Sequence, residues 1–471
     1  MTRGLHWFRN DLRLHDNTAL AALVEKADAW LPVFVLDPRL LEAKTSGGPR
    51  TRFLLDCLAR LGGDLEKLGV PLLVRHGRPE EVLPRLLVET GARLLSFNRA
   101  ATPFARQRDA AVGRAVEKIG GEIIERLDHV VFASSEIRTQ KGSAYSVYSP
   151  YRKTWWRRWM EAPRLPVPLG AMPPPIPDIP FDRIPDAREF GLDARTVELP
   201  AGGEVAANQR LEQFLTTAAG RYHEDRDRPD RDGTSRLSPY LRFGAISIRE
   251  CIVRGEEAIA AEPALESGVA KWLDELLWRE FYSSILEEHP RVLRENYRSE
   301  YDSLVWNDDP NGFEAWCEGR TGYPIVDAGM RQLRETGWMH NRVRMIVASF
   351  LTKDLLIDWR EGERFFFKHL VDGDPASNNG GWQWAASTGT DPQPYFRIFN
   401  PVAQGKRWDP NGDYVRRWIP ELQNVPGAHV HAPWEAQAPP VAYPPPIVDH
   451  AESREVALER FEDARQAGAK S

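Results

Sequence analysis

Residues 4–36 have the sequence GLHWFRNDLRLHDNTALAALVEKADAWLPVFVL, and this stretch decides the fold of the first part of the chain. GLHWFR and AWLPVFVL are short apolar runs that predict buried strands, and NTALAALVEKA between them has apolar residues at helical spacing. The alternation continues with PLLVRHG, ARLLSFN and EIIERL as further strands. It predicts an α/β N-terminal domain over residues 1–130, with a doubly wound, parallel, five-stranded sheet.

The pattern changes after this domain. Residues 131–205 include RLPVPLGAMPPPIPDIPFDRIPDA, which is too rich in proline for a helix and predicts an extended interdomain connector. From 206 to 471 the apolar spacing is helical, with a proline-rich tail, so we expect an all-α C-terminal domain. No GxGxxG follows the first strand, which argues against a standard dinucleotide site there.

The composition limits the class of protein. The chain has 471 residues and a net charge of −6, and it contains no apolar run near the ~18 residues that span a membrane. The N-terminus lacks a secretory pattern. Cys57, Cys251 and Cys317 are far apart and odd in number, which excludes a disulfide framework and favours a reducing cytoplasm. His429 and His431 suggest no third ligand, so we predict no metal site.

Residues 145–159, YSVYSPYRKTWWRRW, are both basic and aromatic. They predict either an arm that faces nucleic acid or the start of a helix that packs Trp155, Trp156 and Trp159 while the arginines face water. The packed helix is the favoured alternative. The acidic net charge does not exclude nucleic acid, because a local basic cleft still neutralises phosphates.

The segment WLDELLWREFY, residues 272–282, places Trp272, Glu275 and Arg279 along one side of a helix. An acid among indoles and a phenol is costly unless a polar ligand meets it, although an intrahelical Glu–Arg pair is the simpler interpretation. In NRVRM, Asn341 and Met345 share one face. Together with DGDPASNNGGWQWAASTGTDPQPYFRIFNP, residues 372–401, these helices predict a pocket lined by indoles, amides, an acid and a thioether.

Residues 232–244, DGTSRLSPYLRFG, supply short hydroxyl and backbone donors before a helix. Such a loop can bind phosphates, or it can be a helix cap. The residues alone favour the cap.

Several long motifs resemble the photolyase/cryptochrome family. They are TSRLSPYLRFG, WREFY, TGYPIVDAGMRQL, GWMHNRVRM and the stretch 372–401, and the N-terminal HWFRNDLRLHDNTAL is similar too. The resemblance covers about residues 1–430. MHNRVRM resembles the class I cyclobutane pyrimidine dimer photolyases, whereas (6-4) photolyases carry histidines around this segment.

The resemblance implies that the helical domain binds FAD in a U-shaped form and that the reduced, anionic flavin is the catalyst. It favours the phosphate-binding loop over the cap. Arg344 would pair with Asp372, and Asn378 would face flavin N5. The implied cofactor-binding residues are Tyr222, Thr234, Ser235, Arg236, Leu237, Ser238, Trp272, Arg344, Asp372, Gly373, Asp374 and Asn378.

The same resemblance implies light-dependent DNA repair, in which an excited reduced flavin passes an electron to a flipped-out pyrimidine dimer. Trp278 and Trp384 would sandwich the dimer, and Glu275 would bind the thymine and stabilise its radical anion. Tyr282, Asn341 and Met345 would line the pocket. The implied DNA contacts are Arg226, Arg279, Arg342, Arg397 and, as a lesser contact, Gln404.

Trp382, Trp359 and Trp306 match the photoreduction chain of the family, although three core tryptophans are the simpler alternative. Trp306 lies between YDSLV and NDDPNG, a polar, turn-like context that predicts contact with solvent.

Two rival functions remain. A cryptochrome would sense light without repair, but Glu275, Trp278, Met345 and Trp384 fill the repair positions, and no long signalling extension follows residue 471. A plain flavoprotein oxidoreductase would need a nicotinamide site, for which there is no fingerprint. We therefore expect a carbon-carbon lyase that acts on damaged DNA as a monomer in a bacterial-type cytosol, at the nucleoid during repair.

The second chromophore departs from the best-known pattern of the family. Folate-binding members carry Asn-Glu and Cys-Lys pairs, and here these positions are Phe104-Ala105 and Leu293-Arg294. A pterin edge without its glutamate would cost roughly 1–3 kcal/mol. TPFARQRD resembles the deazaflavin-binding members instead. We predict a deazaflavin antenna in preference to methenyltetrahydrofolate, or none.

Overall fold

The structure is a computed structural model of the chain, and it describes residues 1–41, 48–180, 183–190, 197–392, 394–427, 429–437 and 442–468. Backbone contacts divide the chain into two compact units. Unit 1 contains residues 1–220 and 235–290, and unit 2 contains residues 221–234 and 291–471. Much of the segment 206–290, which the sequence placed in the helical domain, thus groups with the N-terminal sheet.

Unit 1 is built on a five-stranded parallel sheet in the order β3-β2-β1-β4-β5. The strands are β1 (Arg3–Phe8), β2 (Ala29–Leu36), β3 (Leu73–His76), β4 (Leu94–Asn98) and β5 (Glu122–Arg126). Every residue of β2 is buried, as expected for a parallel strand covered on both faces. The predicted doubly wound α/β sheet is confirmed.

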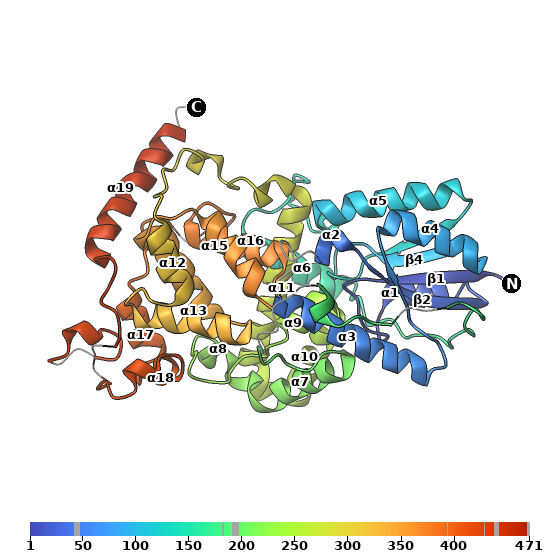
Figure 1. Cartoon of the computed structure of the whole chain (residues 1–471), viewed down its shortest axis with the longest axis horizontal. Coiled ribbons are helices and arrows are strands. Elements are labelled where there is room, and N and C mark those ends of the chain that lie inside the picture. The colour runs from blue at the N-terminus through green and yellow to red at the C-terminus, as the bar shows by residue number, and fades with distance from the viewer. Residues whose placement is uncertain are drawn as a thin grey trace. The chain divides into compact units, whose positions relative to one another are not determined.

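The crossover helices cover both faces of the sheet. Right-handed crossovers place the helices after β1 and β2 on one face and those after β3 and β4 on the other. In Figure 1, α4 and α5 lie together along one face, and α3 lies along the opposite one. These helices are α1 (Thr18–Val24), α2 (Pro38–Leu41), α3 (Gly48–Lys67), α4 (Pro79–Thr90) and α5 (Pro103–Lys118).

Most of the rest of unit 1 is helical. Its helices are α6 (Tyr148–Glu161), α7 (Glu204–Thr217), α9 (Ser238–Phe243), α10 (Ile248–Ala261) and α11 (Glu266–Glu288). Helix α6 buries Trp155 and Trp159 and half-buries Trp156, while Arg157 and Arg158 are exposed. The favoured interpretation of this basic, aromatic segment, a helix that packs its tryptophans, is confirmed.

The connector is therefore extended only in part. Its proline-rich portion runs back to the sheet, where the Trp30 amide donates to Pro174 O at 3.1 Å and the Ile176 amide donates to Trp30 O at 3.2 Å. This short parallel pairing involves the first part of β2. Strand β3 does not reach that part, because it pairs with β2 only from Val33 onward.

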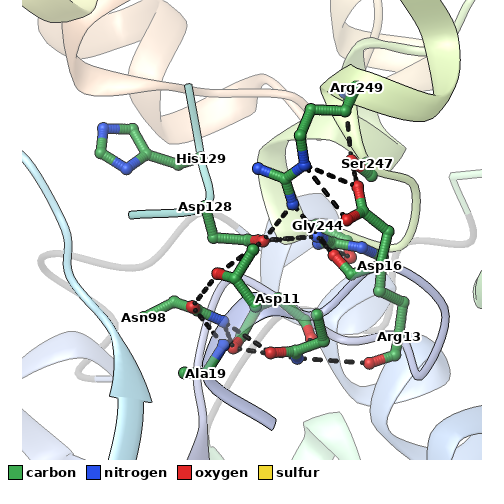
Figure 2. A network of polar contacts seen from close by, with 12 residues as sticks. Asp11, Arg13, Asp16, Ala19, Asn98, Asp128, His129, Gly244, Ser247 and Arg249 are labelled. Atoms are coloured by element: carbon green, nitrogen blue, oxygen red, sulfur yellow. Dashed lines mark hydrogen bonds and ion pairs between the residues drawn. The ribbon is translucent and has the colours of Figure 1, made fainter. Parts of the chain in front are cut away.

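A buried ion network joins the sheet to α10, as Figure 2 shows. Arg249 donates to Asp16 at 2.8 Å and to Asp128 at 2.7 Å, and Arg13 donates to Asp128 at 2.7 Å. Burial alone would raise the pKa of Asp128, but the two guanidinium groups hold it well below its usual range. Removal of one partner would leave a buried charge without compensation.

Unit 2 is helical, and its elements pack around one large apolar cluster that includes Trp316, Val343, Val347, Trp359 and Trp382. Its helices are α8 (Tyr222–Asp225), α12 (Pro310–Glu318), α13 (Pro324–Thr336), α14 (Asn341–Ser349), α15 (Trp359–His369), α16 (Pro375–Ala386), α17 (Pro401–Trp408), α18 (Asp413–Trp418) and α19 (His450–Gly468). One π-helical turn, Phe350–Asp354, follows α14. Within the described residues, no helix is long and apolar enough to cross a membrane.

Candidate functional site

Helix α11 of unit 1 carries a stripe of partly exposed residues on an element that is otherwise mostly buried. Glu275, Trp278, Arg279 and Tyr282 follow one another at spacings of three, one and three, so they lie on one side of the helix. The rings of Trp278 and Tyr282 are 5.6 Å apart. This face therefore presents a carboxylate beside two aromatic rings, as the sequence predicted.

Two other predicted residues of α11 have structural contacts. Arg279 donates to the carbonyl oxygens of His129 at 2.6 Å and Leu241 at 3.3 Å. Trp272 is buried, with its ring 5.2 Å from that of Phe214. Arg279 thus helps to fix α11 within unit 1, and Trp272 belongs to the core beneath the stripe.

The loop before α9 does not form the side-chain cap that its residues alone favoured. The residue at the N-cap position is Leu237, which makes no side-chain cap hydrogen bond. Arg236, just before it, has a positive φ of 50°, which is uncommon for a residue with a side chain. Such strain is typical of loops that bind a ligand, so the hydroxyl-rich loop Ser235–Ser238 fits a phosphate-binding role.

Unit 2 pairs Arg344 of α14 with Asp372, as the sequence predicted. Arg344 Nη2 donates to Asp372 Oδ2 at 2.8 Å, and Arg344 Nε donates to Met339 O at 2.8 Å. The Asp372 side chain is buried, whereas the guanidinium is partly exposed. The pair therefore presents a fixed cation at the surface of unit 2.

Asn378 lies on α16, which begins after Asp374. The Asp374 carboxylate accepts the Ser377 amide at 2.9 Å and so caps the helix. Asn378 Nδ2 donates to Glu363 O at 3.1 Å, and its Oδ1 accepts no hydrogen bond from any other described residue. The amide is thus held by its nitrogen with its oxygen available, which fits a ligand N–H such as flavin N5–H.

Glu363 lies beneath this amide and was not predicted from the sequence. Asn379 Nδ2 donates to Glu363 Oε1 at 3.2 Å, and burial raises the pKa of the carboxyl to about 7. A group that changes charge near neutral pH is thus built into the segment that holds Asn378.

The three tryptophans of the predicted photoreduction chain contact one apolar cluster. Trp382 and Trp359 are buried members of the cluster, and Trp306 packs against it while partly exposed. Trp359 Nε1 donates to Asn296 Oδ1 at 2.9 Å. Gly362 is required beside them, because a Cβ there would lie 2.1 Å from Trp382 Cη2. Trp306 is thus the partly exposed member of the three, which agrees with the predicted solvent contact.

Helix α14 brings the next predicted pair together. Asn341 Nδ2 lies 3.9 Å from Met345 Sδ, so the two side chains share one face, as predicted. Trp384 is half-buried on α16.

Four predicted residues gather around Asp227 in unit 2. Arg342 donates to Asp227 at 2.8 Å and stacks over the Trp408 ring at 4.6 Å. Trp408 Nε1 donates in turn to Gln404 Oε1 at 3.0 Å. The other two are Arg226, whose Nε lies 4.0 Å from Asp227 Oδ1, and Tyr222, whose ring lies 5.7 Å from the Arg226 guanidinium.

Two arginines of this cluster, Arg226 and Arg342, lie at the same carboxylate, that of Asp227. Arg397 is exposed and lies outside the contacts of the cluster that the structure records. Among the described residues, no group of three or more potential metal ligands occurs.

Comparison with known proteins shows which family has these features. The model of the DNA photolyase family matches residues 4–171, and the model of the FAD binding domain of DNA photolyase matches residues 272–463. The chain belongs to the DNA photolyase family.

Relatives within this family match nearly the whole chain. Deoxyribodipyrimidine photo-lyase of Escherichia coli K12 is 42% identical and covers 99% of this chain and 100% of its own length. A class III photolyase structure from Agrobacterium tumefaciens has a TM-score of 0.90 at 36% identity and covers 99% of this chain and 98% of its own. The structure of Synechocystis sp. PCC6803 cryptochrome also has a TM-score of 0.90, at 30% identity, with 98% and 99% coverage. The fold is therefore shared by repair enzymes and by a cryptochrome.

Membership of the photolyase family explains which residues sequence analysis found and which it missed. Long motifs carried many of the predicted residues, and the resemblance along the rest of the chain implied others, such as Tyr222, Glu275 and Trp359. Tyr148, Asn296 and Glu363 lie outside those motifs, and each acts on a predicted residue through a contact distant in sequence. For Tyr148 the signal was the aromatic composition of residues 145–159, while Asn296 and Glu363 had none.

Proposed function

We propose that this protein splits cyclobutane pyrimidine dimers in DNA under blue or near-UV light with reduced FAD as its cofactor. The observation that carries the proposal is the stripe on α11, where Glu275, Trp278 and Tyr282 are partly exposed on a helix that is otherwise mostly buried. Two aromatic rings beside a polar carboxyl group suit an uncharged pair of joined pyrimidines, which can stack on the rings and form hydrogen bonds with the carboxyl group.

For the cofactor, the proposed pyrophosphate contacts come from the loop Thr234–Ser238 and Tyr222. Arg344 orients Asp372 at the flavin and Asn378 accepts a hydrogen bond from N5–H, which agrees with its available oxygen. Gly373, Asp374 and Trp272 complete the set of proposed contacts. When bound, reduced FAD supplies the electron that light transfers to the dimer.

For the substrate, we propose that Trp278 and Trp384 stack against a dimer that has left the duplex. Loss of normal pairing makes a dimer easier to flip out, and stacking on an aromatic residue contributes roughly 1–3 kcal/mol. Glu275 binds the thymine edge and stabilises the charge that develops there. Asn341, Met345 and Tyr282 are further proposed contacts of the dimer.

The DNA backbone would be bound by arginines. We propose phosphate contacts for Arg226 and Arg342, because the two guanidinium groups are brought to one place by the carboxylate of Asp227. Arg279, Arg397 and Gln404 are further proposed contacts. The carbonyl contacts of Arg279 allow it to carry charge at a fixed position.

We propose that Trp306, Trp359 and Trp382 carry electrons from an external reductant to oxidised flavin. The support is the order of exposure, with Trp306 partly exposed and the other two buried in one cluster. The bond from Trp359 to Asn296 would hold the middle indole in place.

For the antenna, we propose a deazaflavin in preference to folate. Phe104 is 37% exposed, and the guanidinium groups of Arg39 and Arg108 lie 5.1 Å and 5.9 Å from its ring. An exposed aromatic face flanked by cations suits a planar, electron-rich ring. Ala105 supplies no carboxylate for a pterin. Reconstitution with each chromophore, followed by energy transfer to FAD, tests this choice, and tight folate binding with efficient transfer contradicts it.

We further propose that the protein acts as a monomer on chromosomal DNA in a bacterial-type cytosol. Size-exclusion chromatography with light scattering tests the oligomeric state, and a dimer at working concentration contradicts it.

The test of the main proposal is a repair assay. The photoreduced protein is mixed with a thymine-dimer oligonucleotide in light and in darkness, and undamaged product is expected only in light. Glu275→Ala should lower the yield while FAD stays bound, whereas Glu287→Ala on the same helix should match the parent. A protein that photoreduces FAD but forms no product in light would be a light sensor instead.

A further inference from the structure

Tyr148 of α6 stacks on Trp278 of α11. The two ring centroids are 3.7 Å apart and the planes differ by 11°, which is close, parallel stacking. Tyr148 is buried, whereas Trp278 is partly exposed. One indole face is therefore covered by the phenol ring, and a ligand can reach only the other.

Tyr148 is itself held by α11. Its hydroxyl donates to Asp274 O at 2.7 Å, four residues before Trp278 on the same helix. Arg152, one turn further along α6, donates to the Asp274 carboxylate. Two contacts at one residue thus fix α6 against α11 and set the position of the phenol ring.

A third ring restricts the indole from the side. Phe281 meets Trp278 edge-on at 5.7 Å and 82°, and it meets Tyr148 edge-on at 5.9 Å and 72°. The indole is therefore confined by a flat contact on one face and an edge contact beside it. Confinement of this kind removes rotamer freedom before any ligand binds.

We propose that Tyr148 is the positioning residue for Trp278: it covers one indole face and presents the other to a flipped-out dimer. This inference rests on the proposed function, in which Trp278 is one wall of the lesion pocket. It assigns a role in recognition to a residue of the connector between the sheet and the catalytic helices. Without Tyr148 the indole could rotate, and part of the stacking free energy would be spent in ordering it.

The test is a double-mutant cycle on dimer binding. Tyr148→Phe and Tyr148→Leu are made in the parent and in Trp278→Ala, and Kd is measured in darkness for a dimer oligonucleotide and its undamaged equivalent. Tyr148→Leu should weaken dimer binding about three- to tenfold, the size of one aromatic pair, and leave undamaged DNA unchanged. Tyr148→Phe keeps the ring and should stay near the parent. In Trp278→Ala, the change to Leu should add nothing.

Tyr151→Leu is the matched control. Tyr151 lies on the same helix, and its ring contacts Phe281 at 5.2 Å. Its loss should change stability but not the ratio of the two Kd values. FAD content and Tm, measured for every variant, identify any variant that fails to fold. If Tyr148→Leu fails to fold, Tyr148→His takes its place in the cycle, with Tyr148→Phe as the conservative comparison.

Three results overturn the inference while the proposed function stands: unchanged dimer binding in Tyr148→Leu, equal weakening for both DNAs, or an undiminished effect in Trp278→Ala. If Trp278→Ala itself binds the dimer as tightly as the parent, the lesion-binding role of Trp278 fails, and the inference fails with it.

Discussion

Arg344 Nη2 donates to Asp372 Oδ2 at 2.8 Å, and the carboxylate of this pair is buried while the guanidinium is partly exposed. Arg344→Ala should therefore remove an ion pair from a buried carboxylate. We expect a loss of about 3 kcal/mol in the free energy of unfolding and a large fall in bound FAD. Denaturant titration and the flavin-to-protein ratio measure the two effects.

Arg344→Lys is the informative companion. It keeps the positive charge but loses the fork that donates to both Asp372 and Met339 O. An intermediate loss is expected. FAD content equal to the parent in Arg344→Ala would show that the pair has no part in cofactor binding.

The network of Figure 2 predicts that two arginines of α10 contribute very differently to the free energy of unfolding. Arg249→Ala removes a buried partner of Asp16 and Asp128 and should lower the free energy of unfolding by about 3–5 kcal/mol. Arg254→Ala removes an ion pair to the exposed Glu212 and should cost no more than about 1 kcal/mol. Equal losses in the two variants would contradict this account of the network.

The raised pKa of Glu363 should make the free energy of unfolding depend on pH. Burial raises its folded pKa to about 7, while the unfolded value stays near about 4.3. Between these values the folded state binds more protons, so the free energy of unfolding falls as pH rises, by an amount on the order of 3 kcal/mol in all. Glu363→Gln should flatten this part of the profile. Urea titrations at acidic and alkaline pH test it, and an unchanged slope counts against it.

Trp306→Phe should abolish photoreduction of oxidised FAD by an external reductant, because the partly exposed indole is the proposed donor. Repair by chemically reduced enzyme should remain. Trp434→Phe is the matched control, since Trp434 packs against the same apolar cluster but is not one of the tryptophans proposed to carry electrons. Photoreduction of Trp306→Phe at the parent rate would mean that another donor acts.

Trp278→Ala should weaken binding of dimer DNA by about 1–3 kcal/mol, the contribution of one stacked base. FAD content should not change. Filter binding with damaged and undamaged oligonucleotides measures the difference, and an equal loss for both would point to backbone contact instead of stacking.

Local pattern was sufficient for the sheet and for much of the site. Apolar runs predicted β1 and β2, and helical spacing predicted that Asn341 and Met345 share a face. Local pattern did not predict which side chains from distant segments would contact each other. Tyr148 and Trp278 are 130 positions apart, and nothing in either segment specifies that the rings meet, because tertiary packing decides this.

The loop before α9 shows a different limit. Serines before a helix usually cap it, and the residues alone favoured that outcome. The backbone instead places Leu237 at the N-cap position after Arg236 in a left-handed conformation. Propensity describes the average environment, and a backbone in an uncommon conformation departs from it.

The pairing of Trp30 with Pro174 and Ile176 has a consequence for self-association. A strand edge with free N–H and C=O groups can recruit a strand from another molecule. Here the connector occupies that part of the β2 edge, and its run of prolines, residues 173–175, has no N–H groups with which to extend the sheet. The segment thus protects the sheet against edge-to-edge aggregation, and substitutions that release it should promote oligomers that grow from this edge.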